Sequence, residues 1–586
     1  MTYQWNIRHL TAVEQELQQQ LERELNISSA AARMLVVRGI QTADEARAFV
    51  HPSLDKLHDP FLMKDMDKAV ERLHKAITQG EKILIYGDYD VDGTTAVALM
   101  YRFLQDLASN LSPLTFNLDY YIPDRYTEGY GVSTQGIDYA AEQGCSLIIT
   151  LDCGIKAVEK IAYANSKGID VIVCDHHTPG DELPDAVAVL NMKRHDCPYP
   201  YKDLSGCGVG FKLAQAYTQR YLASRLSPNS LIALLPLTQL LAMSIASDIV
   251  PITGENRILA HYGIKQLNTQ PFTGLSAIMQ VAGIEAKKIT INELVYKIGP
   301  RINACGRMKS GRAAVELLLT DDPVFARQQA EEVNQHNDDR RDCDTETTKE
   351  ALQQLQDDPN FAQRHSTVVY APHWHKGVVG IVASRLTETY YRPTIVLTAG
   401  EDGIISGSAR SVGGFDIYTA IDSCSDLLTN FGGHKFAAGL SMHIDDLPEF
   451  KQRFEAYVAA HIQPNQLQPT LDIEAELQLG DITKSFYNVL RHLEPFGPGN
   501  PRPLFVSRRL INHRDTRAVG KEREHLRLDV TDRISAITGI AFGRADMAEY
   551  IQNGNAVDIC YELNENTFNH YTTIQMMVQD IRAIKN

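Results

Sequence analysis

Three short apolar runs, each ending on acidic residues, constrain the fold of this chain more than any other feature. The runs KILIYGD, SLIITLD and DVIVCDHH have the length of strands, are rich in β-branched residues and are separated by helix-like segments. This pattern indicates βαβ units and a parallel sheet buried on both faces. Open α/β sheets bind ligands beyond the carboxyl ends of their strands. We therefore expect the acidic groups after these runs to converge.

The stretch GDYDVDG places Asp88, Asp90 and Asp92 at alternate positions after the first run. Three like charges this close repel one another unless a cation lies among them. Other candidate ligands follow the remaining two runs and a later apolar segment: Asp152, His176, His177 and Asp248. Oxygen ligands with a minority of imidazoles favour Mn²⁺ or Mg²⁺ over structural zinc. Two such ions suit the hydrolysis of phosphate esters.

A calcium loop is the alternative interpretation of the DxDxDG pattern. An EF-hand loop needs a glutamate at its twelfth position, and counting from Asp88 this position is Leu99. The mismatch argues against calcium. The remaining alternative is an ordinary acidic turn, which the convergence of three strand ends makes less attractive.

Length and charge set the limits on function. A chain of 586 residues is too long for one core and predicts several domains. The net charge of −16 works against broad attraction to nucleic acid, so any such site should be local. None of the nine cysteines forms a CxxC pair, and the first residues do not resemble a secretory signal. Both observations predict a reducing, cytoplasmic location.

The most apolar long window, residues 231–246, predicts a buried helix and no membrane span. It is shorter than the 18 or more residues that a spanning helix needs, and it contains Pro236. The chain as a whole divides into five predicted segments. They are a helical lead-in (1–65), a parallel α/β domain (66–250), a helical segment ending in a long connecting helix (251–350), a second α/β domain (351–462) and a small β-barrel (463–586).

Several motifs in order identify a family resemblance. GDYDVDG, TLDCG, CDHH, SGCGVGFKL, IASDIVPI and GGHKFAAG together resemble the DHH phosphoesterase superfamily and, within it, the RecJ exonuclease family. The resemblance runs from about residue 30 onward and includes YIPDRYTEGYGV, IGPRINACGRM and LEPFGPGNPRPLF. It implies a DHH domain, a long helix, a DHHA1 domain and a C-terminal OB-fold.

The resemblance also implies roles for the candidate ligands. Asp152 would bridge two ions, Asp88 would shape the site, and His177 would face the scissile phosphate. The implied metal ligands are Asp90, Asp92, Asp152, His176 and Asp248. Cys153 departs from the family, which usually has asparagine at this position. The thiol could make the site sensitive to oxidation, but a small buried residue is the simpler interpretation.

Contacts with phosphate are implied in three places. Arg125 in YIPDRYTEGYG is one, with a surface ion pair to Glu128 as the alternative. A second set either lines a passage between the two halves or staples the connecting helix: Arg301, Asn303 and Arg307. A third set lies in GSARS (407–411) and FGGHKFAAG (431–439), which we expect to be small-residue loops: Ser408, Arg410, Gly433 and His434.

The implied activity is 5′ to 3′ hydrolysis of single-stranded DNA to 5′-mononucleotides with two Mn²⁺ or Mg²⁺ ions, in repair and recombination. A barrel of the OB type would bind the strand, with aromatic residues either stacking on bases or filling the core: Phe505, Phe542, Phe568 and Tyr571. Implied partners are a single-strand-binding protein and a helicase, and we expect a monomer. The alternatives are a nanoRNase or cyclic-dinucleotide phosphodiesterase and a non-catalytic replication scaffold.

Overall fold

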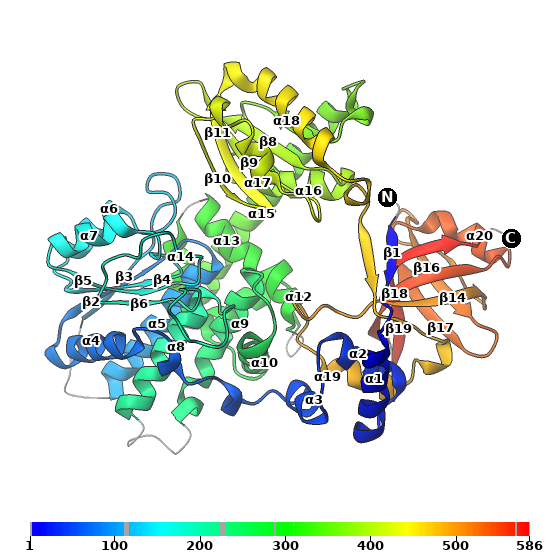
Figure 1. Cartoon of the computed structure of the whole chain (residues 1–586), viewed down its shortest axis with the longest axis horizontal. Helices are drawn as coiled ribbons and strands as arrows, with labels where there is room; N and C mark the ends of the chain where they lie inside the picture. The colour runs from blue at the N-terminus through cyan, green and yellow to red at the C-terminus, as the bar shows by residue number, and fades with distance from the viewer. Residues whose placement is uncertain are drawn as a thin grey trace. The chain divides into compact units, whose positions relative to one another are not determined.

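A computed structural model describes residues 3–110, 117–222, 230–285, 289–308, 310–568 and 571–584 (Figure 1). Its contacts group the chain into two compact units. The first unit comprises Arg47–Asp338 and His492–Arg502. The second comprises Met1–Ala46, Asp339–Arg491 and Pro503–Asn586. The bounds of the five predicted segments stay predictions. The two units do not follow these bounds, since the lead-in predicted over 1–65 is divided between them.

The first unit contains the predicted parallel sheet. Its strands lie in the order β3-β2-β4-β5-β6, and all four pairs are parallel. Their bounds are Lys82–Gly87 (β2), Asn117–Tyr121 (β3), Leu147–Leu151 (β4), Asp170–Cys174 (β5) and Ala188–Leu190 (β6). The fold class expected for this part of the chain is therefore confirmed.

Helices cover both faces of this sheet, as Figure 1 shows. Ile83 and Ile85 of β2 pack into the core formed by one set of helices, whereas Leu84 and Tyr86 pack into the core on the opposite face. The first set is α4 (Met66–Gln79), α5 (Val91–Asn110) and α8 (Gly206–Tyr217), and the second is α6 (Thr134–Glu142) and α7 (Val158–Ser166). Burial on both faces explains why the strands read as continuous apolar runs.

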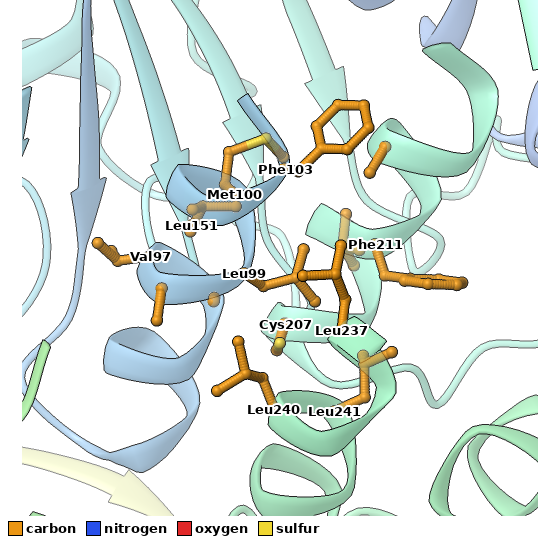
Figure 2. Close-up of a cluster of buried hydrophobic side chains, with 14 of the residues drawn as sticks. Val97, Leu99, Met100, Phe103, Leu151, Cys207, Phe211, Leu237, Leu240 and Leu241 are labelled. Atoms are coloured by element: carbon orange, nitrogen blue, oxygen red, sulfur yellow. The ribbon is translucent and has the colours of Figure 1, made fainter. Parts of the chain in front are cut away.

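The larger core fixes the positions of three helices, each of which has one end near the carboxyl ends of the strands. Figure 2 shows side chains of α5, α8 and α9 (Thr238–Ser247) interdigitating beside β4, among them Leu99, Phe103, Cys207, Phe211, Leu240 and Leu241. Each fully buried leucine or phenylalanine contributes about 1.5–3 kcal/mol. Gly93 lets the first turn of α5 approach the strand end, because a Cβ there would lie 2.4 Å from the carbonyl oxygen of Asp88.

The apolar window 231–246 forms two helical segments where one was predicted. A 3-10 segment, Ser230–Leu237, contains Pro236, and α9 begins at the next residue, Thr238. Proline removes a backbone donor and clashes with the preceding turn, so a single α-helix cannot run through it. None of the helices in the described ranges is long and apolar enough to cross a membrane.

Further helices complete the first unit, and a long helix leads out of it. The smaller ones are α10 (Gly254–Thr269), α11 (Thr273–Val281), α12 (Ile291–Glu293), α13 (Gly299–Met308) and α14 (Gly311–Leu319). The long helix α15 runs over Pro323–Gln356, so the predicted connecting helix is present.

The second unit holds a five-stranded sheet in the order β10-β11-β9-β8-β7, in which only the β7–β8 pair is parallel. The strands are Thr367–Tyr370 (β7), Thr394–Ala399 (β8), Ile404–Arg410 (β9), Asn430–His434 (β10) and Ala437–His443 (β11), with helices α16 (Val379–Tyr390), α17 (Ile417–Asp422) and α18 (Leu447–His461). The prediction that GSARS and FGGHKFAAG are loops was wrong. They form β9 and the β10–β11 hairpin, because buried Ala409, Ala438 and Leu440 alternate with exposed small residues.

The C-terminal part of this unit is a partly closed OB-like sheet. Its order is β13-β14-β18-β19-β17-β16-β15, and an extra β14–β16 pairing bends the sheet toward closure. The strands are Ala475–Glu476 (β13), Phe505–Asn512 (β14), Arg517–Val519 (β15), His525–Thr531 (β16), Ala536–Ala541 (β17), Val557–Phe568 (β18) and Tyr571–Ala583 (β19), with helices α19 (Lys484–His492) and α20 (Ala548–Gln552). The predicted small barrel is confirmed.

The lead-in was predicted to be helical, but the start of the chain also contains a strand. Strand β1 (Gln4–Ile7) pairs in parallel with β12 (Thr470–Ile473). Helices α1 (Ala12–Leu25), α2 (Ser29–Val37) and α3 (Ala43–Val50) follow it. Four residues of strand length carry too little pattern to be recognised without their distant partner.

Candidate metal centre

The acidic groups that follow the parallel strands meet at one edge of the sheet. Asp88 follows β2, Asp152 follows β4, and the Asp-His-His motif follows β5. Nε2 of His176 lies 3.2 Å from Asp152 Oδ1, 3.5 Å from Asp248 Oδ2 and 3.8 Å from Asp92 Oδ2. We call this set the carboxylate edge: Asp88, Asp90, Asp92, Asp152, His176, His177 and Asp248.

Three groups in this set have ligand atoms within 4.8 Å of one another. They are Asp88 with Asp90 and Asp152, Asp92 with His176 and Asp248, and Asp152 with His176 and His177. Asp152 and His176 each belong to two of the groups. Asp88, which the family resemblance assigned a shaping role, lies among the potential ligands themselves.

The carboxylate of Asp92 is held by the N-terminus of α8. The backbone amides of Gly206 and Cys207 donate to its oxygens at 2.7 and 2.8 Å, and the Ser244 hydroxyl donates at 2.7 Å. The partial positive charge of a helix N-terminus favours a carboxylate there. A Cβ on Gly206 would lie 2.5 Å from Asp152 Cβ, so only glycine fits. The motif SGCG therefore forms part of the site. A serine directly ahead of a glycine-rich helix start was the signal available in the sequence for this role.

Sequence reasoning missed the groups that orient His177. Asp175 Oδ1 accepts from the backbone amides of His176 and His177 at 2.7 and 3.0 Å and pairs with His177 Nδ1 at 2.8 Å, while Oδ2 accepts from the Ile155 amide at 2.9 Å. His177 Nε2 lies 3.1 Å from the hydroxyl of Tyr130. The Asp-His-His sequence itself was the available signal for Asp175, whereas nothing in the pattern pointed to Tyr130.

The electrostatics of the carboxylate edge favour the binding of a cation. Both carboxylate oxygens of Asp88, Oδ1 of Asp152 and Nε2 of His176 are buried without a hydrogen-bond partner in the described part of the chain. Burial, and then the charge of Asp90, raises the pKa of Asp88 to about 8. Burial, and then Asp92, raises the pKa of Asp248 to about 9. A donor set of carboxylate oxygens with one or two imidazoles fits Mn²⁺ or Mg²⁺.

Cys153 behaves as a small buried residue. It packs in the core of α6 and α7, and burial raises the pKa of its thiol well above the usual value. Its backbone carbonyl accepts a hydrogen bond from the Thr150 hydroxyl at 2.9 Å. The preceding residue, Asp152, has the left-handed backbone conformation, with φ of 61°. The thiol is therefore protonated and shielded, which makes it a poor ligand and a slow target for oxidation.

Arg125 does not form the surface ion pair considered above. Its guanidinium lies 5.0 Å over the ring of Tyr89. Glu128 instead accepts from the Tyr121 hydroxyl at 3.0 Å and from the Ser133 hydroxyl at 2.5 Å. Arg125 is thus held next to the DYD turn, with its charge adding to the field around Asp88.

The three residues predicted in IGPRINACGRM lie on α13. Arg301 donates to the Asn334 side chain of α15 at 2.9 Å and to the Lys297 carbonyl at 2.6 Å. This contact corresponds to stapling the connecting helix. The carbonyl of Arg307 accepts from the Tyr126 hydroxyl at 2.5 Å, and Asn303 is half-buried.

In the second unit, one face of the sheet carries three of the four predicted residues. Arg410 Nη1 donates to the Ser408 hydroxyl at 2.8 Å, and the strand register places His434 opposite Ala437, which in turn is opposite Arg410. Gly432 and Gly439 form the next cross-strand pair on this face, and a Cβ on either would meet nothing closer than 3.9 Å. We call this the small-residue face: Ser408, Arg410, Gly432, His434 and Gly439. Gly433 lies on the opposite face, where it pairs with buried Ala438, and a Cβ on it would lie 2.4 Å from the Ala437 carbonyl oxygen.

The aromatic residues of the OB-like sheet divide into two classes. Phe505 is fully buried in the core, whereas Phe542 is 60% exposed and Tyr571 is 79% exposed. Tyr571 lines a surface hollow of about 660 Å³ together with Arg514 and Arg527. The side chain of Phe568 lies outside the described residues.

Comparison with known families matches three parts of the chain. The model of the DHH family N-terminal domain matches residues 82–238, that of the DHHA1 domain residues 365–460, and that of the RecJ OB domain residues 473–580.

Two curated relatives decide the family. The single-stranded-DNA-specific exonuclease RecJ of Bacillus subtilis (strain 168) is 35% identical over 568 residues, covering 97% of this chain and 70% of the relative. RecJ of Escherichia coli (strain K12) is 33% identical over 574 residues, covering 94% and 95%. The chain belongs to the RecJ family. The resemblance inferred from the motifs is thereby confirmed.

The RecJ fold agrees with a solved relative over the whole chain. RecJ from Thermus thermophilus in complex with Mn²⁺ matches with a TM-score of 0.82 and 28% identity, covering 100% of this chain and 80% of that one. The same protein in complex with Mg²⁺ gives a TM-score of 0.77. Both metals expected from the carboxylate edge thus occur in a RecJ structure.

Proposed function

We propose that this chain is a single-stranded-DNA-specific exonuclease that hydrolyses phosphodiester bonds with two Mn²⁺ or Mg²⁺ ions. It would work from the 5′ end toward the 3′ end and release 5′-mononucleotides in DNA repair and recombination. One observation carries the proposal. In a chain of the RecJ family, Asp152 forms one candidate ligand group with Asp88 and Asp90. The same carboxylate lies 3.2 Å from Nε2 of His176, which forms a second candidate group with Asp92 and Asp248.

Two sets of residues would hold the ions. Asp88, Asp90 and Asp152 form one, and Asp92, His176 and Asp248 form the other, with Asp152 between them. When bound, two divalent cations lower the pKa of water and offset charge on the phosphoryl oxygens. The chain contributes rigidity, because the α8 amides fix Asp92 and the Leu204 carbonyl lies 3.1 Å from Nδ1 of His176.

His177 would act as the proton donor next to the scissile phosphate. Burial lowers the pKa of His177, but the hydrogen bond to Asp175 and the surrounding carboxylates outweigh burial and raise it. A proton on Nε2 would be shared with a phosphoryl oxygen. Asp175 holds the ring in place through Nδ1, and Nε2, which lies 3.1 Å from the Tyr130 hydroxyl, is the nitrogen that would donate to the phosphate.

The strand would be bound at four places. Arg125 is the candidate for a phosphate near the carboxylate edge, since a guanidinium matches phosphate oxygens in a way that lysine does not. Two further sets are candidates for phosphate contact: Arg301, Asn303 and Arg307 on α13 of the first unit, and the small-residue face around Arg410 and His434 in the second. The OB-like sheet adds exposed Tyr571 with two arginines, which suits base stacking and phosphate contact.

Partners and location are proposed on the same basis. We expect a monomer that works in the cytoplasm with a single-strand-binding protein and a helicase. The two alternatives are less well supported. Small-substrate phosphodiesterases do not need an OB-like sheet, and a scaffold does not need a complete set of buried ligands.

Product analysis with Mn²⁺ tests the proposal. The substrates are 5′-phosphorylated single-stranded DNA, the blunt duplex, single-stranded RNA and a dinucleotide, each labelled at either end, with the Asp152→Asn chain as control. Early release of mononucleotide from the 5′ end of the single-stranded DNA supports the exonuclease. Preferential cleavage of the dinucleotide or the RNA would favour the small-substrate enzyme, and no cleavage with any divalent metal would favour the scaffold.

A further inference from the structure

A segment from the C-terminal part of the chain is built into the unit that carries the carboxylate edge. This segment, which we call the strap, is His492–Arg502, and it groups with Arg47–Asp338 although both flanks of the strap belong to the second unit. Asn500 folds it, because the buried side-chain amide donates to the carbonyls of Leu493 and Pro495, both at 2.9 Å. Gly497 and Asn500 also pair through their backbones at 2.9 and 3.0 Å.

The strap docks on the residues that directly follow Asp248. The backbone amide of Ile252 donates to the Pro498 carbonyl at 2.7 Å. Gly497 packs so tightly on Ile252 that a Cβ there would lie 2.4 Å from its Cδ1. Further along the chain, buried Arg257 donates to the carbonyls of Glu494 at 2.8 Å and His492 at 3.1 Å.

The backbone between Asp248 and this docking point is strained. Asp248 caps the C-terminus of helix α9, and its amide donates to the Ser244 carbonyl at 2.9 Å. The next residue, Ile249, has φ of 58°, a conformation that β-branched residues avoid. Its side chain is 68% exposed, so its own packing does not hold it there. Such strain persists only where the surroundings fix the backbone on both sides.

Several contacts fix the backbone on the far side of Ile249, where Val250 and Ile252 are both buried in the larger core. The Pro251 carbonyl accepts from the Tyr201 hydroxyl at 3.1 Å and from the Asn256 side chain at 3.0 Å. The Ile252 amide has the strap carbonyl of Pro498 as its acceptor, and the Ile252 side chain is fully buried against Gly497. Loosening the strap would therefore let Ile249 relax toward an ordinary conformation and turn Asp248 away from Asp92 and His176.

We propose that the strap is a positioning element for the metal centre, acting through Ile252 and Ile249 on Asp248. The inference rests on the proposed function, because it takes Asp248 as a ligand of one of the two ions. It makes metal binding in the first unit depend on a segment that lies, in the sequence, between strands β13 and β14 of the OB-like sheet. A strap that only ties the unit together would affect stability and leave metal affinity unchanged.

The first test is Gly497→Ala in the full chain, with Gly480→Ala as a matched control. A Cβ on Gly480 would meet only Ser535 Oγ at 3.6 Å, which is ordinary contact. Mn²⁺ binding is measured without DNA by electron paramagnetic resonance of the free ion, followed by the Mn²⁺ dependence of turnover. We expect one of two bound ions to weaken at least about fivefold in Gly497→Ala, with turnover recovering at high Mn²⁺ and KM for the oligonucleotide unchanged. Mn²⁺ affinity within about twofold of wild type would overturn the inference.

A second-site rescue separates positioning from general damage. Ile252→Val removes Cδ1, the atom that the new methyl group meets, so Gly497→Ala with Ile252→Val should regain most of the Mn²⁺ affinity. Failure of this rescue with both chains folded would contradict the proposed route. If Gly497→Ala does not fold, Asn500→Asp loosens the strap without touching Ile252 and should weaken Mn²⁺ in the same direction. A wild-type chain that binds two Mn²⁺ ions without cleaving DNA would refute the proposed function and leave the strap test intact.

Discussion

The carboxylate edge and the small-residue face handle charge in opposite ways. At the edge, several polar atoms are buried without hydrogen-bond partners among the described residues, and burial raises the pKa values of Asp88 and Asp248. On the small-residue face, the Arg410 guanidinium donates a hydrogen bond to the Ser408 hydroxyl. A Cβ on Gly432 or Gly439 would meet nothing closer than 3.9 Å, so no close contact requires glycine at these positions, and the sheet surface there has no side chains. The first arrangement favours the binding of cations. The second leaves room for a nucleic-acid strand of any sequence to lie across the sheet. The difference predicts that damage at the edge lowers kcat and damage at the face raises KM.

The largest effect should come from Asp152→Ala, and Asp90→Ala should behave in the same way. Loss of Asp152, which is proposed to serve both ions, or of Asp90, which is proposed to serve one of them, should lower kcat by more than about 1,000-fold, because hydrolysis with two ions needs both in place. The fold should survive, since the change removes a buried charge that has like charges around it. Circular dichroism and single-turnover cleavage in Mn²⁺ check both points. Residual activity above about a tenth of wild type would remove these residues from the metal site.

Gly206→Ala tests whether the α8 N-terminus is part of the edge. The added methyl group would lie 2.5 Å from Asp152 Cβ, so either Asp152 or the helix start must move. We expect kcat to fall by about 100-fold with a weaker apparent affinity for Mn²⁺. Gly208→Ala is the control, because a Cβ there would lie 3.3 Å from its nearest neighbour, Leu204 Cβ. Equal losses in the two variants would show that the helix, and not the edge, is sensitive.

Asp175→Asn tests the orientation of His177. The amide keeps the shape of the carboxylate but not its charge, so the pKa of His177 should fall and its ring should be held less firmly. We expect kcat to fall about 10- to 100-fold while two Mn²⁺ ions still bind. Kinetics and a Mn²⁺ titration on the same sample check this. Loss of a bound ion would instead make Asp175 a support for His176.

Gly439→Leu tests the small-residue face. Because a Cβ at Gly439 would meet nothing closer than 3.9 Å, the sheet should tolerate the side chain. A strand lying on this face would be obstructed, so KM for a long oligonucleotide should rise about 10-fold with kcat little changed. Ser441→Leu is the control, since it places the same side chain further along β11, opposite Asn430 and away from Arg410 and His434. An unchanged KM in Gly439→Leu would remove this face from the DNA path.

The sequence predicts the carboxylate edge better than the small-residue face, and the reason is physical. Strands that end on charged residues indicate both their direction and the edge at which their ends meet, so Asp88, Asp152 and His176 are found without coordinates. The face depends on strand pairing between β9, β10 and β11, and glycine-rich strands resemble loops because their composition is that of turns. Contacts over long sequence separations are invisible for the same reason. Neither β1 on β12 nor the strap on Ile252 leaves a local pattern.

The smallest expected effect concerns Ile249, whose strained backbone lies between the edge and the strap. Asparagine adopts positive φ more readily than isoleucine, and the side chain is exposed, so Ile249→Asn should stabilise the chain by roughly 1 kcal/mol. The left-handed conformation is kept, and Asp248 should stay in place. Thermal unfolding in EDTA should therefore shift upward while Mn²⁺ affinity and kcat stay within about twofold of wild type. A fall in Mn²⁺ affinity would mean that Asp248 is placed by the isoleucine side chain itself, and the carboxylate edge would then depend on an exposed contact and not on its anchored backbone.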